Sequence, residues 1–304
     1  MHPFKNRFQV FSPLTWPIWL ALGVLWLLTH LPYRIQLSIG SELGRILYLF
    51  PSKLKEITRV NIALCFSEFS QKQQMTLMKE NFRSLGMGIM ETAMAWWTPD
   101  AKLEKRLRII GLEHAEAALA KQKGVILLSP HFICLEMMGR LISMRYRFAS
   151  LYRPHKKPLI AYLHTKFRSR YNIDYIPRHK MRLFIEALRQ NQPVWYAYDV
   201  DGGKQRSVFA PFFGIQTATL TAVSRLTQMT GALVVPVHFY RRKDRQGYEL
   251  HIAPALETFP SNDEIKDATR LNHALETAIR EAPEQYIWQY KRFKTRPKGE
   301  TRIY

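Results

Sequence analysis

The sequence lacks the short motifs that identify many hydrolases and metal enzymes. It contains no G-x-S-x-G segment, so it has no strand-to-helix elbow that would expose a serine nucleophile. It contains neither an H-E-x-x-H segment nor a C-x-x-C pair, and therefore gives no support for a zinc site. The segment Gly203-Lys204-Gln205 lacks the earlier glycine and the following serine or threonine of a phosphate-binding loop. Internal repeats and low-complexity tracts are also missing.

Cysteine is scarce in this chain. The two cysteines, Cys65 and Cys134, both lie in apolar surroundings. This pattern predicts buried thiols rather than a disulfide framework or a metal site. The chain is therefore compatible with a reducing compartment such as the cytoplasm.

Acidic residues are few compared with basic ones. There are 24 Asp and Glu against 45 Lys and Arg, which gives a formal net charge of +21. Such an excess indicates a polyanionic partner: nucleic acid, an anionic membrane, or an acidic protein or substrate. Charge alone does not choose between these. With 304 residues, of which 47% are hydrophobic, the chain can bury a full-sized core, and one large domain is favoured over two small ones.

The segment Pro130–Glu136 has the clearest chemical pattern. It follows the apolar run Gly124–Ser129, so the sequence predicts a buried strand, a turn and then a helix. Residues five apart diverge by roughly 140° on a helix, so His131 and Glu136 can meet only if His131 precedes the helix. Glu136 would then accept a hydrogen bond from one imidazole nitrogen and raise the basicity of the other. We expect a general base, with Glu136 as its partner.

This base has no obvious protein nucleophile to activate. Cys134 is expected to point along the helix, away from His131. The proton to be removed would therefore lie on a substrate hydroxyl or on water, which leaves both transfer and hydrolysis open. The structural alternative is a half-buried histidine at a helix start, followed by a solvated glutamate.

An apolar segment lies near the amino terminus. The run Trp16–Leu28 has no polar side chain, and the wider window Phe11–Leu31 has no charge over 21 residues, enough to cross a bilayer core. Trp16, Trp19 and Trp26 resemble interfacial anchors, and no small-x-small cleavage site follows. We expect a membrane anchor over residues 1–33, ahead of a catalytic domain over residues 34–304. A buried soluble helix is the alternative.

The basic residues around this segment leave its orientation open. Lys5 and Arg7 on one side are balanced by Arg34 and Arg45 on the other. The positive-inside rule therefore does not decide whether the segment spans the membrane or lies in its interface.

The rest of the chain predicts an α/β fold. Residues 33–97 have a helical pattern, with Ser52 as a cap for one helix and Gln71 as the start of a longer one. After Asp100, strands and helices alternate, which predicts a mainly parallel sheet flanked by helices, with residues 248–253 in an antiparallel hairpin at its edge. The expected elements are strands at 106–110, 125–128, 148–153, 194–199 and 233–241, and helices at 114–123, 132–144, 158–170, 181–190 and 219–230.

Basic side chains are candidates for binding an anionic substrate. Arg168 and Arg170 end a predicted helix within possible reach of the crevice that holds His131. Guanidinium groups bind phosphate in a bidentate manner and stabilise developing negative charge. Arg153 and the pair Lys156-Lys157 are secondary candidates for the headgroup. A solvated helix end is the alternative for the two arginines.

Two aspartates follow a predicted strand, at the end where open sheets bind ligands. Asp199 and Asp201 form a D-x-D pair, which raises the hypothesis of a magnesium site. No third clustered carboxylate accompanies them, however, so we expect no metal and assign both to substrate positioning or structural hydrogen bonds.

Several blocks resemble one family in the expected order along nearly the whole chain. The segment Gly124–Glu136 resembles the H-x4-D/E core of the lysophospholipid acyltransferase superfamily, with Glu as in its lipid A branch. Further blocks resemble the lipid A late acyltransferases, in particular the Kdo2-lipid IV(A) lauroyltransferases: Leu151–Pro154, Phe167–Arg170, Pro193–Asp201, Ser207–Gly214, Ala282–Trp288 and Arg292–Pro297.

The resemblance implies a specific reaction. A fatty acyl chain, lauroyl by resemblance, would move from acyl carrier protein to a hydroxyacyl hydroxyl of Kdo2-lipid IV(A), without a cofactor. His131 and Glu136 would be catalytic, and Arg168 would take the role of the arginine implicated in this family's activity. The resemblance also implies a location at the cell inner membrane, with the catalytic domain facing the cytoplasm.

Three alternatives remain open from the sequence. One is the second late acylation of the same pathway, with a myristoyl donor. Another is a membrane-associated thioesterase that uses the same dyad on water. A nucleic-acid binder would also explain the charge, but its stacking aromatics should alternate with basic residues on strands, whereas the aromatics here lie mainly in apolar runs. We therefore expect no nucleic-acid partner.

Overall fold

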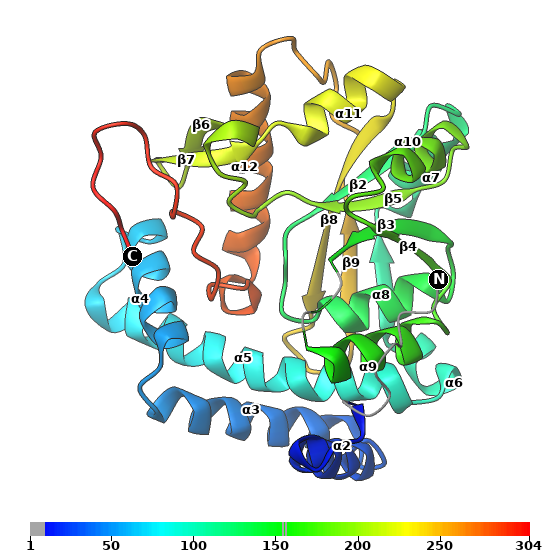
Figure 1. Cartoon of the computed structure of the whole chain (residues 1–304), viewed down its shortest axis with the longest axis vertical. Coiled ribbons are helices and arrows are strands. Elements are labelled where there is room, and N and C mark those ends of the chain that lie inside the picture. Colours follow the sequence, from blue (N-terminus) through cyan, green and yellow to red (C-terminus); the bar gives the residue numbers. More distant parts are fainter. Residues whose placement is uncertain (1–9, 154, 156) are drawn as a thin grey trace.

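A mainly parallel sheet of seven strands forms the centre of the molecule (Figure 1). The computed structural model describes residues 10–153, 155 and 157–304. The strand order is β1-β9-β8-β2-β5-β3-β4, and of the neighbouring pairs β8 and β9 are antiparallel while the others are parallel. This agrees with the predicted fold class. The strands are β1 (Leu107–Ile110), β2 (Val125–Ser129), β3 (Phe148–Tyr152), β4 (Ile173–Pro177), β5 (Val194–Ala197), β8 (Leu233–Arg241) and β9 (Tyr248–Ile252).

Helices cover both faces of this sheet. The connections from β1 to β2, β3 and β4 all move in one direction across the sheet, so right-handed crossovers place their helices on one face. The chain then reverses direction, and the later helices lie on the opposite face, where the Tyr198 and Tyr240 hydroxyls donate to carbonyls of α12. The first face carries α7 (Leu112–Ala120), α8 (Leu135–Ser143) and α9 (Pro158–Arg168); the second carries α10 (Met181–Arg189), α11 (Ala222–Thr230) and α12 (Glu264–Glu281).

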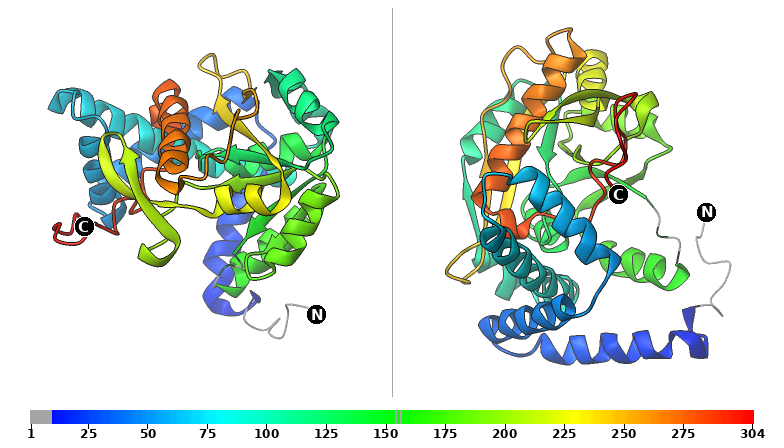
Figure 2. Two further views of the ribbon diagram at one scale, coloured as in Figure 1. Left: turned by 90° about the horizontal axis from the view of Figure 1, so that it is seen from above. Right: turned by 90° about the vertical axis from the view of Figure 1, so that its left-hand side faces the viewer.

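A layer of helices from the first hundred residues packs beside the sheet (Figures 1 and 2). The predicted helical character of residues 33–97 is confirmed. Ser52 Oγ accepts from the Lys55 amide at 3.1 Å, so the predicted cap is present, and Ser70 and Gln73 form a capping box ahead of the long helix. The helices are α2 (Trp16–Leu28), α3 (Tyr33–Leu49), α4 (Lys53–Cys65), α5 (Gln71–Trp97) and α6 (Asp100–Leu103).

Glycines allow α3 and α5 to approach each other closely. A Cβ atom added at Gly44 would lie 2.1 Å from the Phe82 carbonyl oxygen, and one at Gly86 would lie 2.1 Å from the Gly40 carbonyl oxygen. The spacing of Gly40 and Gly44 places both on one face of α3. Backbone-to-backbone contact therefore determines how these two helices pack.

A buried ion pair joins this helical layer to the sheet. Arg241 on β8 donates to the Glu91 carboxylate on α5 through Nε at 2.6 Å and Nη2 at 2.8 Å. The Tyr248 hydroxyl donates to the same carboxylate at 2.9 Å. Both charges are almost fully buried and satisfied, so the relative position of α5 and the sheet is well defined.

The predicted membrane anchor corresponds to α2, a helix of 13 residues. It lies along the outer margin of the molecule (Figure 2). Within the described residues, no helix reaches the length and apolar character needed to span a bilayer, so a membrane-spanning anchor is not confirmed. Lys5 and Arg7, which entered the orientation argument, lie outside the described residues.

Other sequence-based expectations need correction. The expected helix at 219–230 is shorter, because residues 215–220 form β7 (Ile215–Leu220) and pair with β6 (Ser207–Phe212) in a separate hairpin. Its turn residues Phe213 and Gly214 both have positive φ. The hairpin of β8 and β9 is antiparallel as predicted, but β9 is not an edge strand, because β1 pairs with it. Strand β4 and helix α12 were not predicted.

Candidate active site

His131 lies where the sequence places it, after β2 and before α8. Pro130 and His131 follow the last residue of the strand, and the helix begins at Leu135 rather than at Phe132 as predicted. The three residues between His131 and Leu135 form a short connection, in which Phe132 makes an isolated antiparallel β-bridge with Tyr286. His131 therefore lies at the carboxyl end of a central strand, where open α/β sheets bind ligands.

The carboxylate that contacts His131 is Asp199. Nδ1 of His131 lies 2.6 Å from Oδ1 of Asp199, and the His131 amide donates to Oδ2 at 2.8 Å. A carboxylate only accepts, so Nδ1 carries the proton and Nε2 is left free to act as a base. Burial lowers the pKa of His131, but the charge and hydrogen bond of fully buried Asp199 outweigh it, so the net pKa is raised.

Glu136, the predicted partner of His131, is bonded elsewhere. It accepts from Arg168 through Nε at 3.1 Å and Nη2 at 2.5 Å, and from the indole nitrogen of Trp96 at 3.1 Å. Burial raises the pKa of Glu136, but the hydrogen bond and charge of Arg168 lower it overall, so the carboxylate stays ionised. Glu136 lies on the first turn of α8, and its hydrogen bonds join it to α9 and α5. The predicted contact between Glu136 and His131 is therefore absent, and Asp199 makes that contact instead.

His131 and the Glu136–Arg168 pair line one pocket, whereas Asp199 is fully buried and is not part of its wall. His131, Glu136, Arg168 and Arg153 surround a cavity of about 940 Å³, counting the space that opens to solvent. The rings of Trp195 and Tyr290 lie 5.9 and 5.7 Å from the ring of His131. The site is therefore a basic pocket with aromatic walls, large enough for an extended substrate.

A second cavity continues from this pocket between β3 and α9. It measures about 790 Å³ including open space, and its lining includes Arg153, His155, His164, Arg168 and Tyr175. Burial and then the charge of Arg168 lower the pKa of His164 to about 4, so this imidazole is neutral at pH 7. His164 therefore adds no positive charge to that of Arg153 and Arg168.

The carboxyl-terminal segment holds the loop that carries His131. The Ile133 amide donates to the Gln285 carbonyl at 2.8 Å, and the Ile287 amide donates to the His131 carbonyl at 3.1 Å. Asn81 of α5 in turn donates to the carbonyl of Tyr286 at 2.8 Å. Residues 282–288 therefore position the base from a site more than 150 residues away in sequence, which no local pattern could reveal.

The other predicted substrate residues lie in different places. Arg153 lines both cavities. Arg170 is exposed and lies over the Phe167 ring at 5.2 Å, outside the residues that line either cavity. Asp201 accepts from the amide and hydroxyl of Thr295, so it holds the carboxyl-terminal tail. Lys156 and Pro154 lie outside the described residues.

Both cysteines are buried free thiols, as predicted. Cys134 donates to the Phe239 carbonyl, and burial raises the pKa of its thiol. It is therefore directed into the core rather than at His131. Within the ranges that the structure describes, no three His, Cys, Asp or Glu side chains are grouped as metal ligands would be.

Comparison with known proteins identifies the family to which this site belongs. A model of the bacterial lipid A biosynthesis acyltransferases matches residues 1–295. The chain belongs to this family. The lipid A biosynthesis palmitoleoyltransferase of Escherichia coli (strain K12) is 38% identical over 297 residues, covering 97% of each chain. The lipid A biosynthesis lauroyltransferase of the same organism is 39% identical over 296 residues, with the same coverage. A lipid A biosynthesis acyltransferase of Haemophilus influenzae is 34% identical over 298 residues, covering 95% and 94%.

The protein is therefore a lipid A acyltransferase, an enzyme of lipid A biosynthesis. The two Escherichia coli relatives are almost equally similar to it but are named for different acyl chains. Family membership therefore leaves the transferred chain open.

Proposed function

We propose that this lipid A acyltransferase moves a fatty acyl chain from acyl carrier protein to a hydroxyacyl hydroxyl of Kdo2-lipid IV(A). Lauroyl is the chain that we propose. The observation that supports this most is the pairing of His131 with Asp199 at the wall of a large basic pocket. A base without an adjacent protein nucleophile suits direct attack by a substrate hydroxyl.

His131 removes the proton in this mechanism. Nε2 takes it from the acceptor hydroxyl, while Asp199 holds Nδ1 and stabilises the imidazolium that forms. The oxygen attacks the thioester carbonyl and forms a tetrahedral intermediate. Collapse of the intermediate forms the ester and breaks the carbon–sulfur bond, and the leaving thiolate takes the proton back from His131. Atoms and charge balance without a cofactor.

Arg168 stabilises negative charge in the pocket, and Glu136 positions it. Glu136 engages Nε and Nη2 of Arg168, and Nη1 has no hydrogen-bond partner among the described residues. Nη1 can therefore reach the oxyanion or an anionic group of the acceptor. Glu136 thus acts through Arg168 in this proposal, in a pair that is mostly buried, and the role predicted for it beside His131 passes to Asp199.

The basic character of the enzyme suits both substrates. Arg153 lines both cavities, and in this proposal its guanidinium binds the anionic headgroup of the acceptor. A net charge of +21 also favours encounter with an acidic carrier protein. We assign no substrate role to Arg170 or Asp201, because their side chains are engaged outside the cavities.

The proposal includes a location on the cytoplasmic side of the inner membrane, with residues 1–33 as anchor and residues 34–304 as catalytic domain. Several apolar side chains of α2 are exposed, including Leu20 at 73% and Leu27 at 61%. Trp16 is 64% exposed at the start of the same helix. An exposed apolar helix with tryptophans suits the membrane interface.

The proposal is tested with purified enzyme, lauroyl-loaded acyl carrier protein and Kdo2-lipid IV(A), with mass spectrometry of the lipid product. We expect a gain of one lauroyl group. His131→Ala and Glu136→Ala should each lower turnover by about 100-fold or more, because one removes the base and the other releases Arg168. His179→Ala, a change at an exposed histidine in a turn, is the matched control and should retain full activity.

Two results would contradict the proposal. Turnover near wild type in folded His131→Ala enzyme would remove the base from the mechanism. Consumption of the thioester at the same rate with and without the lipid acceptor would instead indicate a thioesterase. Preference for a penta-acylated acceptor and a myristoyl donor would assign the second late acylation.

A further inference from the structure

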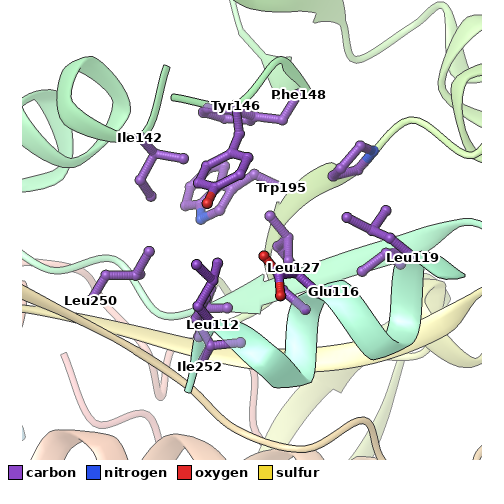
Figure 3. A pocket seen from close by; sticks show the side chains of 14 residues that line it. Leu112, Glu116, Leu119, Leu127, Ile142, Tyr146, Phe148, Trp195, Leu250 and Ile252 are labelled. Carbon is purple, nitrogen blue, oxygen red and sulfur yellow. The ribbon is translucent and has the colours of Figure 1, made fainter. Parts of the chain in front are cut away.

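Cavities outside the active site differ in room and in polarity. The apolar pocket between α7 and α8 (Figure 3) leaves about 70 Å³ in which a water-sized sphere fits, so the converging side chains fill most of it. A polar pocket at the turn between α2 and α3 leaves about 250 Å³ on the same measure, compared with about 300 Å³ for the His131 pocket. One water needs roughly 10–15 Å³ on this scale, so the polar pocket has room for a group of several non-hydrogen atoms.

This polar pocket lies beside the proposed membrane-facing helix. Its wall includes residues 29–33, which join α2 to α3, together with residues of α5 and of the segment that follows α5. Trp26 and Leu27 are exposed at the carboxyl-terminal end of α2, and Leu31 is exposed in the turn. With α2 in the membrane interface, the pocket therefore lies at the level of the lipid headgroups.

Two basic side chains of this pocket have no acidic partner among the described residues that line it. The guanidinium group of Arg106 lies 3.9 Å from the centre of the Tyr33 ring, and its Nη1 donates to the Gln246 carbonyl at 3.3 Å. These contacts hold the guanidinium group in place, while Nε and Nη2 have no hydrogen-bond partner within the described part of the chain. Lys102 lines the same pocket. A pre-positioned arginine beside a lysine is suited to a phosphate group.

Two buried polar atoms of the residues that line this pocket also lack partners. Nε2 of Gln36 donates to the carbonyls of Thr29 and Leu31 at 3.1 and 2.7 Å, which fixes the amide so that Oε1 is its free acceptor. Oε1 of Gln36 and Oγ1 of Thr98 have no hydrogen-bond partner among the residues that the structure describes. Such groups are unfavourable when unsatisfied. A hydroxyl both donates and accepts, so a hydroxylated ligand satisfies them once the Thr98 side chain, which no hydrogen bond of its own holds, rotates towards the cavity.

We propose that this pocket binds the headgroup of an anionic glycerophospholipid whose phosphodiester carries a hydroxylated substituent, as in phosphatidylglycerol. The phosphate lies against Arg106 and Lys102, the headgroup hydroxyls lie towards Gln36 and Thr98, and the acyl chains extend along the exposed apolar side chains of α2. A headgroup with an ammonium group is disfavoured, because basic side chains and no carboxylate line the described wall. The inference rests on the proposed location of α2 at the membrane but not on acyl transfer.

Vesicles of equal charge test the inference. Binding of the full-length protein is measured by flotation with phosphatidylcholine vesicles that contain either phosphatidylglycerol or the same fraction of phosphatidylserine. We expect about tenfold tighter binding to the phosphatidylglycerol vesicles, since hydrogen bonds to charged groups are worth roughly that factor. Lys102→Gln and Thr98→Val should each remove this preference. Thr98→Val deletes a hydroxyl that has no partner within the described residues, so this variant should be as stable as wild type.

Lys105→Gln is the matched control for Lys102→Gln, because Lys105 is exposed three residues further along and does not line the pocket. It removes the same charge and should keep the preference for phosphatidylglycerol. Equal binding of wild type to both kinds of vesicle, or loss of the preference in Lys105→Gln as well, would overturn the inference. Loss of the preference when inorganic phosphate is added at constant ionic strength would assign the pocket to free phosphate instead. Leu20→Glu should weaken binding to both kinds of vesicle alike, which separates the headgroup site from the apolar contact of α2.

Discussion

At the scale of the residue, the chemistry of the site depends on which carboxylate reaches which base. Asp199 is fully buried and gives one oxygen to the His131 ring and the other to the His131 amide, so the imidazole has one orientation and one tautomer. Glu136 lies in the pocket wall and forms an ion pair with Arg168. Asp199 therefore orients the imidazole that takes the proton, whereas Glu136 binds the guanidinium group of Arg168.

Asp199→Asn should lower turnover by about 10²-fold to 10⁴-fold, because the amide stabilises the imidazolium poorly and permits the wrong tautomer. The base works when deprotonated, so the rate rises with pH through the pKa of His131. Asp199 raises that pKa, and its loss should move the acidic limb of the pH–rate profile to lower pH. Asp201→Asn makes the same change in a residue bound to Thr295 and should keep the wild-type profile. An unshifted limb in Asp199→Asn would contradict the pairing.

At the scale of the element, two asparagines on the helical layer hold the carboxyl-terminal segment. Asn61 on α4 donates to the carbonyls of Trp288 and Tyr290, and Asn81 on α5 donates to that of Tyr286. This segment pairs with the His131 loop and supplies the Tyr290 ring to the pocket. The packing of α5 on α3 therefore helps to determine where the carboxyl-terminal segment, and with it the His131 loop, lies.

Gly44→Ala should destabilise the fold by about 1–3 kcal/mol, because its Cβ would lie 2.1 Å from a backbone oxygen of α5 that cannot move alone. Chemical denaturation measures the free energy of unfolding. Gly23→Ala on α2 is the matched control, since no atom lies within 4 Å of its added Cβ. Equal stability of the two variants would show that α3 and α5 are less closely packed than described.

At the scale of the whole molecule, a group of exposed apolar side chains lies on the amino-terminal helices. α2 and α3 lie at one margin, and their exposed apolar side chains include Leu20, Leu27, Ile46 and Leu49. A surface of this kind usually binds a partner or a membrane. The excess of basic residues adds attraction to anionic lipids.

Leu20→Glu should weaken binding to vesicles of anionic and zwitterionic phospholipid, because it places a charge on the exposed side of α2. Flotation of the full-length protein with such vesicles measures the bound fraction, and added salt should lower it further. Met229→Glu is the matched control, because Met229 is also an exposed apolar residue, 60% against 73% for Leu20. It lies on α11 at the opposite side of the molecule, so this variant should bind as wild type does. Equal loss in both variants would count against α2 as the membrane-facing element.

Local structure was decided by the sequence itself. The Ser52 cap, the long helix from Gln71, and the strand, turn and helix around His131 depend on side chains within a few residues of one another, so their patterns could be interpreted directly. The alternation after Asp100 likewise predicted a mainly parallel sheet. The hairpin of β6 and β7 was missed because its turn residues, Phe213 and Gly214, do not form a usual hairpin pair.

Only the tertiary structure decided which side chains meet. Asp199 reaches His131 because β5 lies beside β2, and strand order depends on long-range pairing rather than on the spacing of residues. For the same reason Glu136, five residues from His131, binds Arg168, 32 residues away. The sequence thus determined the chemical groups and their local elements, whereas the packing of distant elements determined the partner of the base and the shape of the pocket.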